Sequence, residues 1–110
     1  MTELRSEHPQ EYPKGTTSLP GNEIRRLASE VPRWEVRGNR LVRAFEFRDF
    51  NQAFGFLTRV ALLAEAESHH PDIGNSWNEV TLEFWTHTAA GLTRNDFIMA
   101  ARIDAFLDNQ

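Results

Sequence analysis

The stretch from Phe50 to about Ser68 is the longest patterned run in this 110-residue chain, and it has the spacing of an amphipathic helix. Asp49 precedes it as a candidate N-cap, with Gln52 three residues on, as in a capping box. A helix so apolar around its circumference needs more than one partner surface. We expect one face to pack on a sheet and the other on a neighbouring subunit; a wide core face in a monomer is the alternative. Its two apolar stripes, roughly 120° apart, are Phe50, Phe54, Leu57, Ala61 and Ala64, and Phe56, Val60 and Leu63.

Strand patterns lie on both sides of this helix. Trp34–Arg37 and Arg40–Phe47 flank the turn signal Gly38-Asn39, which predicts a β-hairpin. Trp77–Thr86 alternates between apolar and polar residues, so it predicts a half-buried strand.

Two further helices are predicted near the ends of the chain. Asn22–Val31 has one apolar face and is stopped by Pro32. Thr93 begins the last helix, and Asp96 stands three residues later, as in a capping box. The order is therefore α-β-β-α-β-α. It predicts an α+β fold, in which an antiparallel sheet of three to four strands has three helices packed on one face.

The length predicts one domain. Residues 1–17 are polar, contain prolines and show no apolar periodicity, so we expect a flexible N-terminal tail before a single domain at 18–110. His8 belongs to this tail and is interpreted as a bystander.

Composition argues against several functions. The net charge of −4 disfavours nucleic-acid binding. No apolar run approaches the roughly 20 residues that cross a bilayer, and Met1–Thr17 lacks the apolar core of a secretory signal. We therefore expect a cytoplasmic protein with no membrane contact. The chain has no cysteine, and its only lysine, Lys14, and only tyrosine, Tyr12, lie in the tail, so thiol, Schiff-base and buried-tyrosine chemistry are not expected.

Histidine and carboxylate side chains remain for chemistry. His69 and His70 are adjacent at the end of the predicted central helix, and His87 closes the last predicted strand. Histidine can give or take a proton near neutral pH because its ordinary pKa is about 6.5. The group indicates acid–base chemistry or a metal site, with helix C-terminal capping as the structural alternative for His69 and His70.

The spacing of these residues resembles that of the pterin-4a-carbinolamine dehydratases, whose signature the chain carries at Glu65, His69-His70-Pro71, Trp77, His87 and Asp96. The similarity extends from about Leu19 to Leu107. The flanking matches include Trp34, Phe45-Glu-Phe47, Asp49-Phe50, Gly91-Leu92-Thr93 and Ala101-Arg-Ile-Asp104. Ile73 departs from the family, which often has an aromatic residue there, so the shape of one edge of the pterin pocket can differ. Glu79 and Thr88 stand where a basic and an acidic residue are common.

The resemblance implies a hydro-lyase that converts 4a-hydroxytetrahydrobiopterin, or a related 4a-hydroxytetrahydropterin, into the quinonoid dihydropterin. The reaction belongs to pterin cofactor recycling (tetrahydrobiopterin biosynthesis), beside an aromatic amino acid hydroxylase. No electron is transferred, so no cofactor is expected, and the family uses no metal. An acid must protonate the leaving oxygen and a base must accept a ring-nitrogen proton, which histidines near neutral pKa can do.

By the same resemblance, His69 and His87 are the expected acid–base pair, and His70 binds substrate or shares the proton transfer. Glu65 and Asp96 are candidates to orient a histidine tautomer by accepting its other N–H. Asp96 as a helix cap and Glu65 as a solvated residue are the simpler interpretations. The substrate-binding positions implied are Pro71, Trp77, Thr86 and Thr88, with core or interface packing as the alternative for Trp77.

One geometric condition follows from strand length. Trp77 to His87 spans roughly 33 Å if fully extended. For His87 to meet His69, the link after Pro71 must first run away from the helix end, with Gly74-Asn75 helping the chain to turn back.

Two other functions remain open. The first is an interaction module, or transcriptional dimerisation cofactor, that uses the outer face of the helix at 50–68, since vertebrate members of the family bind a homeodomain transcription factor. The second is a metal enzyme using His69, His70 and His87, although adjacent histidines diverge. A homo-oligomer, dimer or tetramer, is expected.

Overall fold

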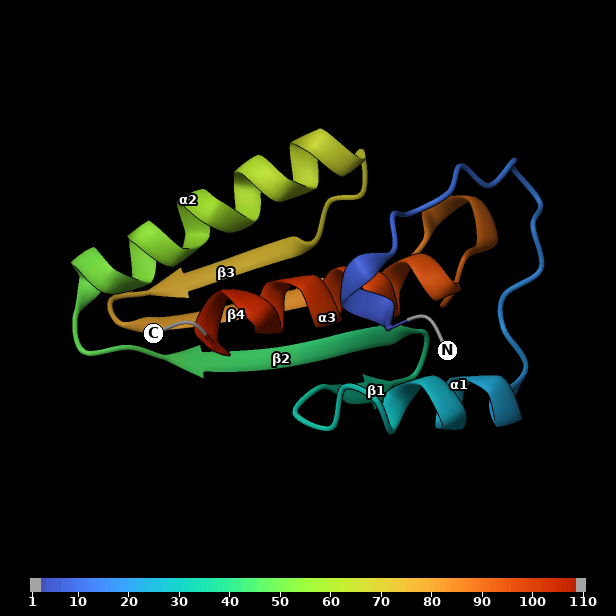
Figure 1. Cartoon of the computed structure of the whole chain (residues 1–110), viewed down its shortest axis with the longest axis horizontal. Helices are drawn as coiled ribbons and strands as arrows, with labels where there is room; N and C mark the ends of the chain where they lie inside the picture. The colour runs from blue at the N-terminus through green and yellow to red at the C-terminus, as the bar shows by residue number, and fades with distance from the viewer. Residues whose placement is uncertain (1–2, 109–110) are drawn as a thin grey trace.

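The computed structural model describes residues 3–108, which form one four-stranded antiparallel sheet with helices against it (Figure 1). The strands lie in the order β1-β2-β4-β3. In chain order the elements are η1 (Leu4–Ser6), α1 (Gly21–Ala28), β1 (Glu35–Arg37), β2 (Arg40–Glu46), α2 (Phe50–Glu67), β3 (Asp72–Ser76), β4 (Glu79–Phe84), η2 (His87–Ala89) and α3 (Arg94–Asp108). The predicted α+β class is confirmed.

The core lies between the sheet and the helices α1, α2 and α3. Figure 1 shows α3 in front of the central strands, with α2 on the β3 side and α1 on the β1 side. Leu41, Leu82 and Phe84 of the sheet and Phe97 and Met99 of α3 are all fully buried. Burying one such side chain contributes about 1.5–3 kcal/mol, so this layer holds the ends of β4 and α3 together. Among the described residues, no helix is long and apolar enough to cross a membrane.

Both ends of α2 are set by local hydrogen bonds. Asp49 accepts from the Gln52 backbone N–H at 2.9 Å, and this bond lowers the pKa of the Asp49 carboxyl. The Gln52 side chain accepts from the Arg48 N–H rather than from the Asp49 N–H. At the other end Ser68 is left-handed, with φ 54°. This cap stops the helix and turns the chain just before His69.

The buried face of α2 differs from the predicted stripes. It consists of Ala53, Phe56, Leu57, Val60 and Ala64. Phe50 and Phe54, predicted to share a stripe with Leu57, are 48% and 53% exposed, and Leu62 is 68% exposed. The apolar circumference therefore divides into a core face and an outer face that no other described element covers.

The link after Pro71 is a strand that the residue pattern does not predict. β3 pairs along β4, with Gly74 opposite Thr81 and Asn75 opposite Val80. The expected turn at Gly74-Asn75 is therefore wrong; the chain turns at Trp77, whose φ is 49°. The Asn75 side chain donates to the carbonyls of Trp77 and Glu79 across this turn. The excursion away from α2 and back, which the spacing of His69 and His87 requires, is present.

The N-terminal residues also differ from the loose tail that their composition suggests. Residues 4–16, here called the N-terminal strap, run from α3 past the end of α2 and over η2 (Figure 1). Leu4 is 3% exposed and packs in the core. A single buried leucine and a set of polar contacts leave no periodicity in the sequence, which is why the pattern does not reveal them.

Candidate active site

A cavity of about 550 Å³ opens where the end of α2, the end of β4, η2 and the start of α3 meet. His69, His70 and His87 all line it, with Thr86 and Thr88. The structure thus brings the two segments that carry the histidines to one hollow, although 18 positions separate His69 from His87.

His69 is held by the start of α3. Its Nε2 lies 2.7 Å from Oδ1 of Asp96, which is fully buried. A carboxylate only accepts hydrogen bonds, so Nε2 carries the proton. In the neutral ring Nδ1 therefore has the lone pair that can accept a proton. Nδ1 makes no hydrogen bond within residues 3–108. The His69 ring also stacks on Phe84, with 5.9 Å between centroids and 4° between planes.

The second oxygen of Asp96 is fixed by two threonines. Oδ2 accepts from the Thr86 hydroxyl and from the Thr93 backbone N–H, each at 2.9 Å. The Thr86 hydroxyl in turn lies 2.7 Å from the Thr93 hydroxyl, which donates to it. Asp96 is therefore both a partner of the helix N-terminus and the partner of His69, so the two interpretations of this residue are compatible.

His70 has a different setting. Its Nε2 lies 2.8 Å from Oε1 of Glu65, but the two side chains are 59% and 82% exposed. A contact so exposed contributes little stability. Glu65 does not line the cavity, and it contacts the site only through His70.

His87 is positioned by an aromatic ring that the sequence reasoning missed. Trp85 stacks on it with 3.9 Å between centroids and 28° between planes. The Arg40 guanidinium lies 5.0 Å from the Trp85 ring. The Trp85 Nε1 is buried and has no hydrogen-bond partner among the described residues. Trp85 falls on the polar face of the predicted strand, and that position next to His87 is the signal that could have revealed it.

The remaining predicted residues separate into two groups. Thr86 is 5% exposed, and Thr88 lines the cavity and accepts at its carbonyl from the Gly15 N–H at 2.9 Å. Pro71 and Trp77 do not line the cavity. Trp77 is 65% exposed on the β3–β4 turn, separated from η2 by the length of β4, roughly 20 Å for six residues.

No metal-binding arrangement supports the alternative of a metal enzyme. Within residues 3–108, no three His, Asp or Glu side chains are grouped so as to hold an ion. His69 and His70 leave α2 toward different carboxylates, Asp96 and Glu65.

Comparison with known proteins agrees with the geometry. The family model described as pterin 4 alpha carbinolamine dehydratase matches residues 17–106. A relative from Chlorobium limicola is 56% identical over 88 residues, 76% of this chain and 78% of the relative. One from Rubrobacter xylanophilus is 41% identical over 105 residues, 94% of this chain and 98% of the relative. Both carry the name pterin-4-alpha-carbinolamine dehydratase provisionally. A crystal structure of a transcriptional coactivator/pterin dehydratase from Brucella melitensis matches with TM-score 0.77 and 35% identity, covering 81% of this chain and 97% of that one.

Proposed function

This chain belongs to the pterin 4 alpha carbinolamine dehydratase family, and on that premise we propose that it dehydrates 4a-hydroxytetrahydropterins by histidine acid–base catalysis. The observation that carries the proposal is the meeting of His69, His70 and His87 in one cavity. In the reaction the bond from C4a to the hydroxyl oxygen breaks as that oxygen is protonated. A ring-nitrogen proton leaves, and water and the quinonoid dihydropterin are the products.

The contacts of the two main histidines support different roles. His69 is the base through Nδ1, since its Nε2–H donates to Asp96, and a buried carboxylate stabilises the imidazolium that forms. His87 is the acid that protonates the leaving oxygen, because it has no carboxylate partner among the described residues and is solvent-exposed. Each positioned group of this kind contributes roughly 10²–10⁴-fold to a rate. His70 binds the substrate at the exposed rim.

The substrate class follows from the family. We assign 4a-hydroxytetrahydrobiopterin as the substrate and pterin recycling as the setting. An aromatic amino acid hydroxylase supplies the carbinolamine there and a reductase consumes the product. The reaction transfers no electron, so it requires no redox cofactor.

The test is a stopped-flow measurement of carbinolamine loss, with and without the protein. Wild-type protein should accelerate the loss, and His69→Ala or His87→Ala should lower kcat by at least about tenfold. Arg48→Ala is the control, because Arg48 is exposed in the loop before α2 and does not line the cavity. Wild-type rates in both histidine variants would refute the assigned roles.

The uncovered face of α2 supports a homo-oligomer, in which a second copy of this chain packs on Phe50, Phe54 and Leu62. β3 is an edge strand whose five residues are all exposed, and such an edge presents unpaired backbone groups to a partner. The interaction-module alternative assigns the same α2 face to a different protein. Finding a stable complex with another protein, together with no dehydratase rate, would favour that alternative.

A further inference from the structure

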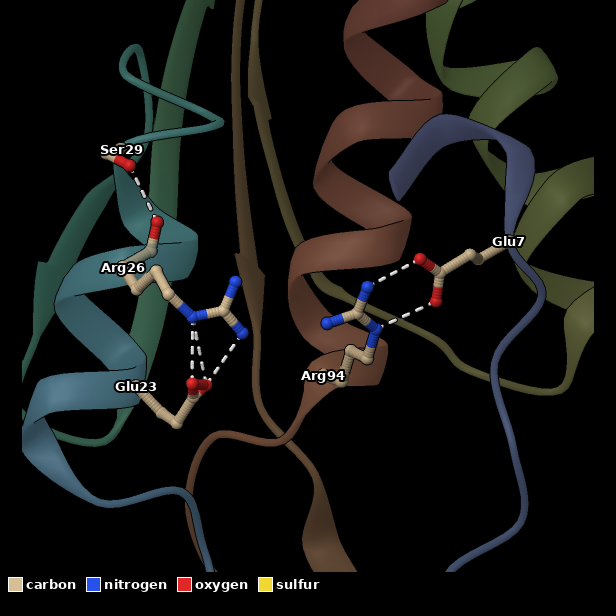
Figure 2. Close-up of polar contacts among 5 residues, drawn as sticks. All are labelled: Glu7, Glu23, Arg26, Ser29 and Arg94. Carbon is tan, nitrogen blue, oxygen red and sulfur yellow. Dashed lines mark hydrogen bonds and ion pairs between the residues drawn. The ribbon is translucent and has the colours of Figure 1, made fainter. Parts of the chain in front are cut away.

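The first residues of the N-terminal strap contact α3. Leu4 is buried against the core, and the Glu7 carboxylate accepts two hydrogen bonds from Arg94, at 2.8 and 2.5 Å. Figure 2 shows this paired contact between the strap and the first turn of α3. The Arg94 guanidinium lowers the pKa of the Glu7 carboxyl, so the pair is charged at neutral pH.

Two further attachments adjoin the proposed catalytic residues. Asn95, which is 3% exposed, accepts from the Gln10 backbone N–H at 2.9 Å and donates to the Gln10 carbonyl at 2.6 Å. The Gly15 N–H donates to the carbonyl of Thr88. Asn95 precedes Asp96 and Thr88 follows His87. The strap is therefore attached next to Asp96, the hydrogen-bond partner of His69, and next to His87 itself.

Between these attachments the strap faces the cavity. Pro9, Gln10, Glu11 and Tyr12 line it together with the histidine rings. His8 lies 3.0 Å from Glu67, another lining residue, and so joins the strap to the end of α2. The cavity thus has a wall formed by residues that precede the family match, which begins at residue 17.

Tyr12 is the strap residue best suited to contact a pterin. It is half-buried, lines the cavity, and makes no hydrogen bond or ring contact within residues 3–108. By contrast, Trp85 is stacked on His87. A pterin is a flat conjugated bicycle, and aromatic side chains pack favourably against such rings. An unengaged aromatic ring on the cavity wall can therefore bind the substrate without taking part in proton transfer.

We propose that Tyr12, carried by the N-terminal strap, packs against the pterin ring and determines the affinity of the site for its substrate. This inference rests on the proposed function for the identity of the ligand as a pterin. It adds a binding residue that precedes residues 17–106, the part matched by the family model, and it makes the strap part of the active site.

The experiment compares full-length Tyr12→Ala, Tyr12→Phe and Lys14→Ala proteins. Lys14→Ala is the matched control, because Lys14 is an exposed strap residue that does not line the cavity. Two quantities are measured: KM and kcat for the carbinolamine, and Kd for 7,8-dihydrobiopterin, which has no 4a hydroxyl and cannot be dehydrated. Tyr12→Ala should raise both KM and Kd roughly 5- to 20-fold. Its kcat should stay within about twofold, because only binding is lost. Tyr12→Phe and Lys14→Ala should match wild type.

The outcomes separate this inference from the proposed function. Unchanged KM and Kd in Tyr12→Ala would overturn the inference, and so would a lower kcat with an unchanged Kd. A wild-type protein that binds 7,8-dihydrobiopterin through Tyr12 but dehydrates nothing would leave the inference standing and refute the enzyme assignment. Matching thermal unfolding of the variants and wild type checks that each variant is folded.

Discussion

The Nε2 atom of His69 lies 2.7 Å from Oδ1 of Asp96, a residue 27 positions further along the chain. This bond joins the end of α2 to the first turn of α3. It sets the proton on Nε2 and leaves Nδ1 as the basic nitrogen. Asp96 is fully buried and does not line the cavity, so the chemistry proposed for His69 depends on a carboxylate that the substrate does not touch.

Asp96→Asn tests this dependence. An amide has no charge to stabilise the imidazolium, and it can pair with either tautomer of His69. We expect kcat to fall roughly 10²–10³-fold, with KM within about threefold. The stopped-flow assay measures both constants. Asp49→Asn is the control, because Asn caps helices as well as Asp does and Asp49 lies at the other end of α2. A wild-type kcat in Asp96→Asn would contradict the assignment of His69 as base.

The Thr86 hydroxyl should contribute to the stability of the fold. It is buried, donates to Asp96 and accepts from Thr93. Thr86→Val leaves both of these partners one hydrogen bond short, which should cost about 1–3 kcal/mol. Thr86→Ser keeps the hydroxyl and should lose less than about 1 kcal/mol. Urea unfolding compares the two variants; a loss in Thr86→Val no larger than that in Thr86→Ser would contradict this role for the hydroxyl.

Trp85 should position His87. With 3.9 Å between ring centroids, the indole limits the directions that the imidazole can take. Trp85→Leu should lower kcat about tenfold, whereas Trp85→Phe keeps a ring and should lose less. In wild-type protein the indole ring current should shift the His87 ring protons upfield in NMR spectra. If Trp85→Leu removes this shift but leaves kcat unchanged, the stack does not serve catalysis.

The residues that could be predicted from the sequence are those with periodic neighbours. The apolar spacing of α2 and the alternation of β4 identify those elements because each has a buried face. β3 escapes prediction because all five of its residues are exposed, so no alternation marks it. The histidine cluster could be identified from the family's spacing. The contacts of His69 with Asp96 and of His87 with Trp85 are geometric details that only the folded chain supplies.

The strap escapes prediction for a different reason. Glu7 meets Arg94 across 87 positions, and Gln10 meets Asn95 across 85. Pairs this distant leave no local pattern in a polar segment. The strap's polar residues follow no pattern in the sequence, because their hydrogen-bond partners lie near the other end of the chain.

Acid should loosen the strap. The Arg94 guanidinium lowers the pKa of Glu7, and the hydrogen bond to Glu7 raises the pKa of Arg94, with smaller contributions from the charges of Glu30 and Glu23. A lowered carboxyl pKa stabilises the folded state above the ordinary value of 4.5, and this stabilisation is lost as the pH falls through the lower folded value. The contribution is small, below about 1 kcal/mol, because solvent screens the pair.

Hydrogen exchange at the Gln10 and Gly15 amides can detect this loosening. On acidification below pH 4.5 their protection should fall in wild-type protein, after correction for the intrinsic exchange rate. Glu7→Gln should show lower protection already at neutral pH and a weaker dependence on acid. Glu67, whose pKa is lowered chiefly by the hydrogen bond with His8, adds an effect of the same sign. Equal pH dependence in wild type and Glu7→Gln would contradict this role for Glu7.

The outer face of α2 should control the oligomeric state. Phe54 and Leu62 are 53% and 68% exposed, and exposed apolar side chains of this size are typical of a subunit interface. Phe54→Glu or Leu62→Glu would place a charge in the interface, so light scattering should show a smaller assembly at the same protein concentration. Gln52→Glu is the control, because it adds the same charge on another side of α2 and keeps the acceptor that bonds the Arg48 N–H. Phe54 and Leu62 do not line the cavity, so each variant should keep its dehydratase activity unless activity requires contact between subunits. A wild-type mass in both variants would contradict a subunit interface on this face of α2.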